Sequence, residues 1–283
     1  MTTPTHIPWV TLNDGHRIPA VGFGSPDAPP DLAVKAFLAA LDAGFRLIDT
    51  ARCYGNEGVV GRAVAESDLP REEILIETKL PGLGHGYDEA KRAFDVSLRE
   101  LKLDYVDLYL IHWPNPGVDK YVDAWRAMIE LRDEGRAKSI GVSNFPRPFL
   151  ERLRDETGVL PAVNQIERHI QWHNQATLET DAALGIVTES WSALAKGASL
   201  DNPIVVEVAA AHGVTPAQVV LRWNIQGGSV PLTYSRQPER IARSADLFSF
   251  ELTADEMARL DTLEKGQLFD YDVYTYDQLT PIE

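Results

Sequence analysis

Three titratable side chains each end a short apolar segment in the first half of the chain: Asp49, Lys79 and His112. Tyr54 follows Asp49 after a short polar loop. A lysine ammonium near a tyrosine favours the phenolate, so Lys79 is expected to lower the pKa of Tyr54. An acid whose pKa lies nearer neutrality donates a proton more readily to a developing alkoxide. Asp49 would keep Lys79 charged, and His112 would hydrogen-bond a substrate carbonyl and set its angle. These residues predict a proton-transfer group.

Each of these residues also has a simpler interpretation when it is taken alone. An aspartate before a helix is most often a cap, which is one interpretation of Asp49. Lys79 could serve as a Schiff-base amine, although Asp49 beside it would keep it protonated. Cys53 is expected to line the pocket next to Tyr54, because no basic partner is placed to produce a thiolate.

The elements that would bring these residues together are short apolar strands that alternate with amphipathic helices. Strands are predicted at Ala20–Gly22, Phe45–Asp49, Ile74–Lys79, Val106–Ile111, Ala137–Val142, Ala162–Ile166, Ile186–Ser190 and Ser229–Leu232. Helices are predicted at Leu32–Ala43, Glu57–Glu66, Asp88–Leu101, Tyr121–Arg132, Pro146–Glu156, Gln175–Leu184, Pro203–His212, Pro216–Gln226, Pro238–Ala245 and Ala254–Leu263. A hairpin over Trp9–Ile18 precedes them, because Asn13-Asp14-Gly15 forms a turn readily.

This alternation predicts an α/β fold in which helices cover a parallel sheet. Strand–helix units of this number and length favour a closed (β/α)8 TIM barrel with an N-terminal β-hairpin and extra C-terminal helices. Residues 1–283 show no linker or composition break, so a single domain is expected. Gly22-Phe23-Gly24-Ser25 falls short of the Gly-x-Gly-x-x-Gly fingerprint, which disfavours a dinucleotide-binding open sheet. Barrels carry their active sites at the carboxyl ends of the strands, where the titratable residues stand.

The composition excludes several classes of partner. The chain has 283 residues, a net charge of −15 and a pI near 4.9. An acidic protein repels phosphate backbones and anionic lipids, so neither nucleic acid nor membrane is an expected partner. Cys53 is the one cysteine, which excludes an internal disulfide and fits the cytoplasm. Residues 1–6 do not resemble a signal peptide, and no apolar run approaches the roughly 18 to 20 residues of a membrane span.

With these motifs in this order, the chain resembles the aldo-keto reductase family. The segments that carry the resemblance are Asp49–Glu57 (Asp-Thr-Ala-x-x-Tyr-x-Asn-Glu), Lys79, His112-Trp113-Pro114 and Gly141–Phe145. The similarity extends over nearly the whole chain. It is closest to bacterial 2,5-diketo-D-gluconate reductases, through His112–Pro116 and Thr188–Ser192.

The resemblance implies a barrel that binds NADP(H) across its C-terminal mouth. Tyr54 would be the proton donor, Asp49 and Lys79 its tuning pair, and His112 the group that orients the carbonyl. The residues that match nicotinamide-binding positions are Ser143, Asn144 and Gln165 for the carboxamide and Trp191 for stacking on the ring. Ser192 and Leu194 match positions that contact the pyrophosphate. Asn144 as a mere helix cap, and Trp191 and Trp113 as plain core residues, are the simpler alternatives.

The chain departs from the family in three segments: the loop around Pro26, the segment from Leu232 to Arg240, and the loop His169–His173, where altered substrate shape is the functional interpretation. Pro26 stands where an aromatic residue usually forms a wall of the substrate pocket. Cys53 and Trp113 are expected to form other parts of that wall. Leu232 is interpreted as replacing the lysine that grips the adenosine 2'-phosphate, with an insertion after it. The residues left to hold the phosphate end are Thr233, Ser235, Arg236 and Arg240. NADP(H) is favoured, and NAD(H) is possible because of Leu232.

The function that the resemblance implies is NAD(P)H-dependent reduction of an aldehyde or ketone to an alcohol. A diketo sugar acid and a small dicarbonyl are candidate substrates, no metal is expected, and a monomer is expected because monomers are common in the family. The alternative is a cofactor-binding redox sensor or subunit with little turnover. The complete group of Asp49, Tyr54, Lys79 and His112 argues against that alternative, because a sensor needs no proton donor.

Overall fold

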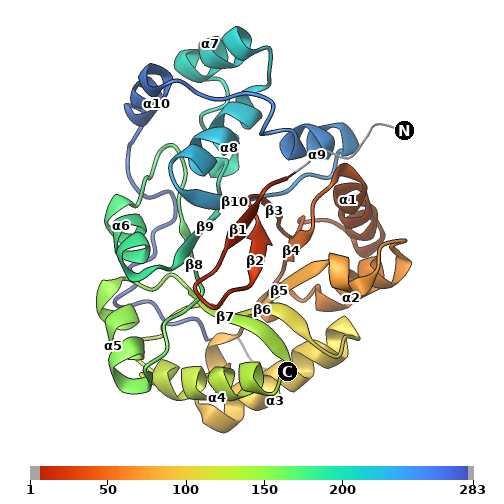
Figure 1. Cartoon of the computed structure of the whole chain (residues 1–283), viewed down its shortest axis with the longest axis vertical. Helices are drawn as coiled ribbons and strands as arrows, with labels where there is room; N and C mark the ends of the chain where they lie inside the picture. The colour runs from red at the N-terminus through yellow and green to blue at the C-terminus, as the bar shows by residue number, and fades with distance from the viewer. Residues whose placement is uncertain (1–6, 280–283) are drawn as a thin grey trace.

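A closed barrel of parallel strands forms the centre of the computed structural model, which describes residues 7–279 (Figure 1). The order around the barrel is β10-β3-β4-β5-β6-β7-β8-β9. These strands are β3 (Gly22–Phe23), β4 (Leu47–Asp49), β5 (Leu75–Leu80), β6 (Val106–Ile111), β7 (Ala137–Ser143), β8 (Val163–Glu167), β9 (Val187–Trp191) and β10 (Ser229–Thr233). The predicted (β/α)8 barrel is therefore confirmed, with strand boundaries displaced by up to two residues.

Helices surround the barrel and bury their apolar faces against it (Figure 1). They are α1 (Pro30–Ala43), α2 (Glu57–Glu66), α3 (Tyr87–Leu101), α4 (Tyr121–Asp133), α5 (Arg147–Thr157), α6 (Gln175–Leu184), α7 (Pro203–His212), α8 (Pro216–Gln226), α9 (Pro238–Ala245) and α10 (Ala254–Asp261). On α3, the buried residues Ala90, Phe94, Leu98 and Leu101 recur at helical spacing, as predicted. The ring of Phe94 packs 4.7 Å from that of Tyr109 on β6.

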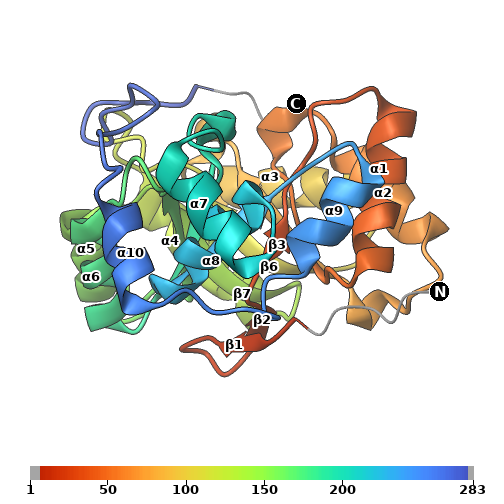
Figure 2. The same ribbon diagram turned by 90° about the horizontal axis from the view of Figure 1, so that it is seen from above.

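The N-terminal hairpin closes one end of the barrel. It consists of β1 (Trp9–Thr11) and β2 (Arg17–Pro19), which pair antiparallel as predicted. Leu12 and Ile18 are buried in one apolar cluster with barrel residues such as Leu108. Burial of each such side chain contributes about 1.5–3 kcal/mol to stability. Figure 2 shows the hairpin below the barrel and the C-terminal loops above it, so the mouth at the strands' carboxyl ends is left for the site.

The C-terminal segment, defined as residues 262–279, crosses that mouth without forming a helix or strand (Figure 2). Asn115, which is fully buried, holds the backbone of Gln278: its Nδ2 donates to the Gln278 carbonyl at 2.9 Å, and its Oδ1 accepts from the Gln278 N–H at 3.0 Å. A Cβ at Gly82 would overlap the carbonyl of Gln278. A glycine at residue 82 is therefore required for this segment to pack here.

Within residues 7–279, no single helix is both long and apolar enough to span a membrane. Only α7 and α8 taken together reach the required length and composition, and the chain bends by 91° between them.

Candidate active site

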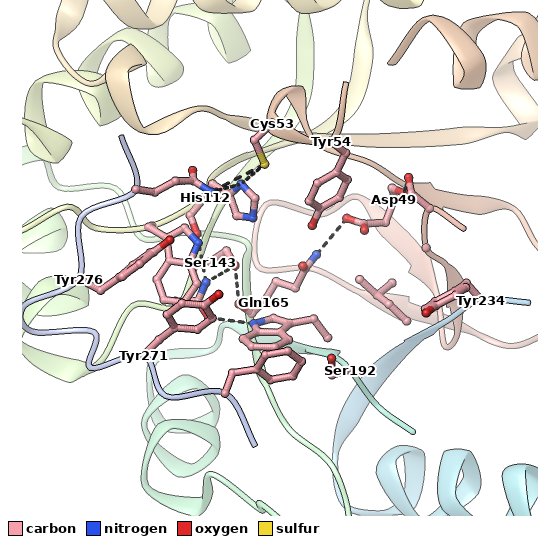
Figure 3. Close-up of a pocket in the computed structure, with 18 residues that line it drawn as sticks. Asp49, Cys53, Tyr54, His112, Ser143, Gln165, Ser192, Tyr234, Tyr271 and Tyr276 are labelled. Atoms are coloured by element: carbon pink, nitrogen blue, oxygen red, sulfur yellow. Dashed lines mark hydrogen bonds between the residues drawn. The ribbon is translucent and has the colours of Figure 1, made fainter. Parts of the chain in front are cut away.

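Asp49, Tyr54 and His112 converge at the mouth of the barrel (Figure 3), and Lys79 is hydrogen-bonded to Asp49 there. Lys79 is fully buried on β5, and its Nζ donates to Asp49 Oδ1 and, at 2.9 Å, to the Thr50 carbonyl. The same nitrogen lies 5.5 Å from the centre of the Tyr54 ring. The rings of Tyr54 and His112 meet edge to face, with their centres 5.8 Å apart. The ends of β4, β5 and β6 and the turn after β4 thus bring all four side chains to one cleft.

A single turn of 3-10 helix, Arg52–Tyr54, presents the tyrosine above the end of β4. Gly55 ends the turn with a φ of 64°, a conformation that glycine adopts without strain. Glu57 then begins α2 and accepts a hydrogen bond from Thr78 at 2.7 Å, which ties the loop to β5. The N-cap of α2 is Asn56, so the interpretation of Asp49 as a helix cap is wrong.

The electrostatics of the cleft keep Lys79 charged and Tyr54 protonated. Burial opposes the charge on Lys79, but the charge and hydrogen bond of Asp49 favour the ammonium, and its pKa is raised. Burial also raises the pKa of Tyr54 above its ordinary value, against the lowering effect of Lys79. Although 47% of the tyrosine is exposed, its hydroxyl points down into the crowded cleft (Figure 3). The net lowering of the Tyr54 pKa expected from sequence is wrong for this structure, because burial outweighs the ammonium.

His112 is held as a neutral imidazole, with two polar partners at its Nδ1. Burial and the charge of Lys79 lower its pKa well below the ordinary value. Its Nδ1 lies 3.4 Å from Cys53 Sγ and 3.4 Å from Nε2 of Gln278 in the C-terminal segment. Burial raises the pKa of Cys53 to about 11, so the sulfur stays a thiol, the form that can donate. With donors at Nδ1, the ring proton of His112 belongs on Nε2.

Replacement of Gln278 by leucine is expected to lower kcat/KM for carbonyl reduction by about two- to tenfold, through kcat. The loss of one donor to Nδ1 corresponds to about 0.5–1.5 kcal/mol of hydrogen bonding. Steady-state kinetics at saturating cofactor would measure it. Gln267→Leu is the matched control, because Gln267 lies in the same segment and donates to the Tyr271 carbonyl. Equal losses in both variants would contradict a role of Gln278 on His112.

A hydrogen-bonded layer beside the cleft joins the residues expected to face the nicotinamide. Ser143 Oγ donates to the Gln165 carbonyl at 2.7 Å, and Asn144 Nδ2 donates to the His112 carbonyl at 3.1 Å. Trp191 Nε1 donates to Asn144 Oδ1 at 2.8 Å. Asn144 adopts a φ of 64°, and Pro146, not Asn144, is the N-cap of α5. These contacts exclude the cap interpretation of Asn144.

Two connected cavities open from this layer. The first, of about 390 Å³, is lined by Gly24, Ser25, Asp49, Cys53, Tyr54, His112, Trp113, Ser143, Asn144, Gln165, Trp191, Ser192, Leu232, Tyr234, Phe269, Tyr271, Tyr276 and Gln278. The second, of about 550 Å³, is lined by Ser192, Ala193, Leu194, Lys196, Gly197, Leu200, Leu232, Thr233, Tyr234, Ser235, Arg236, Gln237 and Arg240. The shared residues Ser192, Leu232 and Tyr234 join them into one groove.

The groove fits an extended nicotinamide dinucleotide. Its first part offers amide and hydroxyl groups and the half-buried ring of Trp191, which suit a carboxamide and a flat heterocycle. Its second part offers the cations Lys196, Arg236 and Arg240, which suit phosphates. Every residue expected from the sequence to hold the cofactor lies along this groove. Among the described residues, no group of three or more His, Cys, Asp or Glu side chains is placed to hold a metal ion.

Leu232 lines both cavities, at the point where they join. It lies within β10 and is only 7% exposed, and a Cβ on Gly22 of β3 would stand within 2.5 Å of its Cδ2. A longer side chain at residue 232 would therefore begin from a buried, closely packed position. The first side chain open to the groove after the strand is Tyr234, which is 56% exposed. Neither Leu232 nor Tyr234 carries a charge, so the cations of the second cavity are Lys196, Arg236 and Arg240.

The substrate side of the first cavity is mostly aromatic. Trp113 is 6% exposed, because Tyr271 and Tyr276 of the C-terminal segment pack edge-on against it at 5.1 Å and 4.6 Å. It forms a wall of the cavity and is not plain core. Pro26 is buried and is not among the lining residues, and Ser25 provides the wall from that loop instead. Cys53 lines the cavity as expected.

Several residues of the site were not foreseen from the sequence. Phe269, Tyr271, Tyr276 and Gln278 of the C-terminal segment line the first cavity, and the density of tyrosines there was the available signal. Glu77 and Glu189 lie buried beneath the cleft. The signal for Glu77 was the alternation of side-chain direction along β5. Thr78 faces α2, so Glu77 and Lys79 on either side of it both face the barrel interior.

Residues 20–265 match the Aldo/keto reductase family, in keeping with this cleft and groove. The chain belongs to that family. An aldo-keto reductase of Mycolicibacterium smegmatis is 47% identical over 270 residues, 95% of this chain and 98% of the relative. The 2,5-diketo-D-gluconic acid reductase B of a Corynebacterium species is 46% identical over 275 residues, 97% of this chain and 99% of the relative. An Asp-to-Ala mutant of Gox0644 in complex with NADPH has a TM-score of 0.91 and 40% identity, covering 96% of this chain and 99% of that one.

Membership in the aldo/keto reductase family makes the protein an NAD(P)H-dependent oxidoreductase that acts on small carbonyl compounds. The predicted resemblance is confirmed, including the similarity to a 2,5-diketo-gluconate reductase.

Proposed function

We propose that this reductase converts an uncharged aldehyde or ketone to an alcohol, with Tyr54 as the proton donor. The observation that carries the proposal is the convergence of Tyr54, His112 and the Asp49–Lys79 pair on one cavity lined by aromatic residues. When bound, the nicotinamide cofactor supplies the hydride. The residues of the chain supply the proton and the orientation of the carbonyl.

The chemistry of the chain's own residues follows from their protonation states. Tyr54 Oη and His112 Nε2 donate hydrogen bonds to the substrate oxygen and fix its position. As negative charge develops on that oxygen, the phenol proton moves to it and a tyrosinate forms. Lys79, kept charged by Asp49, stabilises this anion. The aromatic side chains of the C-terminal segment exclude water, which strengthens each of these interactions.

The lining of the first cavity supports an uncharged substrate. No lysine or arginine is among the residues that line it, so a substrate carboxylate would lose hydration without gaining a cation partner. A diketo sugar acid, the substrate class in the name of the Corynebacterium relative, is therefore the less favoured candidate. Comparing kcat/KM for phenylglyoxal, which is uncharged, with kcat/KM for the phenylglyoxylate anion, by the rate of NADPH oxidation, would distinguish the two classes of substrate. A higher kcat/KM for the anion would overturn the assignment, and cofactor binding without turnover on any carbonyl would indicate a redox sensor.

NADPH is the proposed cofactor, held at its phosphate end by Arg236 and Arg240. Both guanidinium groups line the second cavity and are exposed, and neither has an ion-pair partner within residues 7–279. Because the whole chain carries a charge of −15, an anionic ligand needs such local cations. Leu232 and Tyr234 line the groove before these arginines and carry no charge, so one charged contact to the phosphate is missing and NADH is a usable second cofactor.

The double variant Arg236→Ala/Arg240→Ala is expected to weaken NADPH binding by about tenfold or more. Each lost charge-assisted contact corresponds to about 1.5–3 kcal/mol. NADH affinity should change by less than about threefold, because that cofactor lacks the 2'-phosphate. Tryptophan fluorescence titrations would measure both, with Tyr234→Lys as the converse variant that should favour NADPH. Unchanged NADPH affinity in the double variant would show that the phosphate is held elsewhere.

A further inference from the structure

Two glutamates meet inside the barrel directly beneath the cleft. Glu77 comes from β5 and Glu189 from β9, which stand on opposite sides of the closed barrel, and neither is exposed to solvent. Nε2 of Gln165 lies 2.5 Å from Glu77 Oε1 and 3.2 Å from Glu189 Oε2. One amide nitrogen therefore touches both carboxyl groups and holds them side by side. We propose that Glu77 and Glu189 share a single proton, and that this carboxyl pair is a positioning pair that orients Gln165 toward the nicotinamide.

The unpaired oxygen atoms identify where the proton lies. Glu77 Oε2 and Glu189 Oε1 are both buried, and neither has a hydrogen-bond partner among the described residues. Two ionised carboxylates in contact would leave both atoms unsatisfied and would repel one another. A proton on Glu77, donated to Glu189, gives the two carboxyl groups a hydrogen bond to one another. It also removes one of the two negative charges.

The charged groups that face the pair do not supply a counter-ion for two carboxylates. Lys79 Nζ lies 3.9 Å from Glu77 Oε1, but its hydrogen bond goes to Asp49. Asp49 itself adds a negative charge, Gln165 is neutral, and the phenol of Tyr54 is protonated. Burial, Glu189 and Asp49 raise the pKa of Glu77 well above its ordinary value. Burial raises the pKa of Glu189 to about 7, with hydrogen bonds from Glu77 and Gln165 opposing the rise.

The pair determines which end of the Gln165 amide is available to the cofactor. Nε2 of Gln165 is directed at Asp49, Glu77 and Glu189, so its hydrogens are used below the cleft. Oε1 is then the amide atom left for the cavity that Gln165 lines, where it can accept from the N–H of a carboxamide. This role toward the cofactor rests on the proposed function. The shared proton rests on the geometry alone.

The sign of the pH dependence follows from the raised pKa values. The folded protein binds the proton more tightly than the unfolded chain, in which glutamate titrates near its ordinary pKa. The pair's contribution to stability is therefore fully present below that ordinary pKa. It is lost as the pH rises above about 7, where Glu189 is ionised and Glu77, with the more strongly raised pKa, gives up the last proton. Deprotonation would also free Gln165 to turn, so cofactor affinity should fall over the same range.

Glu77→Gln is the variant that tests the shared proton, because its amide N–H can donate to Glu189 at every pH. Infrared difference spectra of the cofactor-free protein at about pH 8, where Glu189 is ionised, should show a protonated carboxyl band, shifted in D2O, that Glu77→Gln removes. Absence of that band from the wild-type protein would overturn the proposal. The wild-type spectrum alone keeps the test decisive if Glu77→Gln folds poorly.

NADPH titrations from about pH 6 to about 8.5, followed by tryptophan fluorescence, test the positioning role. The wild-type Kd should rise several-fold as the pH rises above about 7, whereas the Kd of Glu77→Gln should follow a flatter profile. Glu77→Leu, which cannot hold Gln165, should bind NADPH more weakly at every pH. The cofactor's own phosphate titrates equally in all three proteins, so the difference between slopes isolates the pair. Identical slopes for wild type and Glu77→Gln would contradict the positioning role. Neither measurement needs turnover, so failure of the proposed carbonyl reduction would be seen separately.

Discussion

Lys79→Met is expected to lower kcat for carbonyl reduction by about 10³-fold and to lower the melting temperature as well. The kinetic loss arises because a tyrosinate formed at Tyr54 would face Asp49 with no cation between them. The loss of stability arises because Lys79 is fully buried and its removal leaves Asp49 as an uncompensated charge. Breaking a buried pair in this way costs about 3–5 kcal/mol. Single-turnover kinetics and thermal unfolding would measure the two effects.

The double variant Lys79→Met/Asp49→Asn separates these two effects. Neutralising Asp49 removes the unpaired charge, so much of the lost stability should return while the lost activity should not. Lys91→Met is the surface control, because Lys91 pairs with Glu130 where both are partly exposed, and such pairs contribute about 0–1 kcal/mol. A kcat of Lys79→Met within about tenfold of wild type would exclude the lysine from proton transfer.

Tyr54→Phe is expected to lower kcat by about 10²- to 10⁴-fold, because the variant keeps the ring but loses the proton. Stability should change little, since 47% of the tyrosine is exposed and no described residue depends on its hydroxyl for a hydrogen bond. The Kd for NADPH should stay within about twofold, because Tyr54 is not needed for the phosphate contacts. Tyr271→Phe, a matched change in the same cavity, should reduce kcat/KM far less.

Much of the barrel was predictable from sequence because its elements are short and strongly patterned. The apolar spacing of α3 and the glycine after α1, with a φ of 107°, fix those helices locally. Asp49, Lys79 and His112 were predicted to meet because the carboxyl ends of parallel strands share one mouth. The residues that local pattern determines were therefore the ones predicted well.

The remainder depends on contacts between distant segments. The burial of Leu232 is set by Gly22 on the neighbouring strand β3, which no local pattern reveals. Gln278 reaches His112 because Asn115 and Gly82 hold its backbone. Such docking of an irregular segment leaves no periodic signal in the sequence.

The electrostatics also depend on the whole fold. The presence of Lys79 correctly indicated a cation near Tyr54, but the net pKa shift depends on how many atoms surround the phenol. Likewise, Glu77 on β5 and Glu189 on β9 become neighbours only because the barrel closes. Their strands stand on opposite sides of it, and the two side chains meet in its interior. Burial and partners of a titratable group are tertiary properties, so the sequence predicts the kinds of group present and not their protonation.

The most direct test of carbonyl reduction in this cleft is a single-turnover measurement of NADPH oxidation by an aromatic aldehyde. It is made in H2O and in D2O, and with NADPH that does or does not carry deuterium at the transferred position. The proposed chemistry predicts oxidation in wild type that is slowed both by cofactor deuteration and by D2O, and that is lost in Tyr54→Phe with NADPH still bound. Tight NADPH binding without oxidation by any carbonyl, or oxidation that Tyr54→Phe leaves near the wild-type rate, would contradict it.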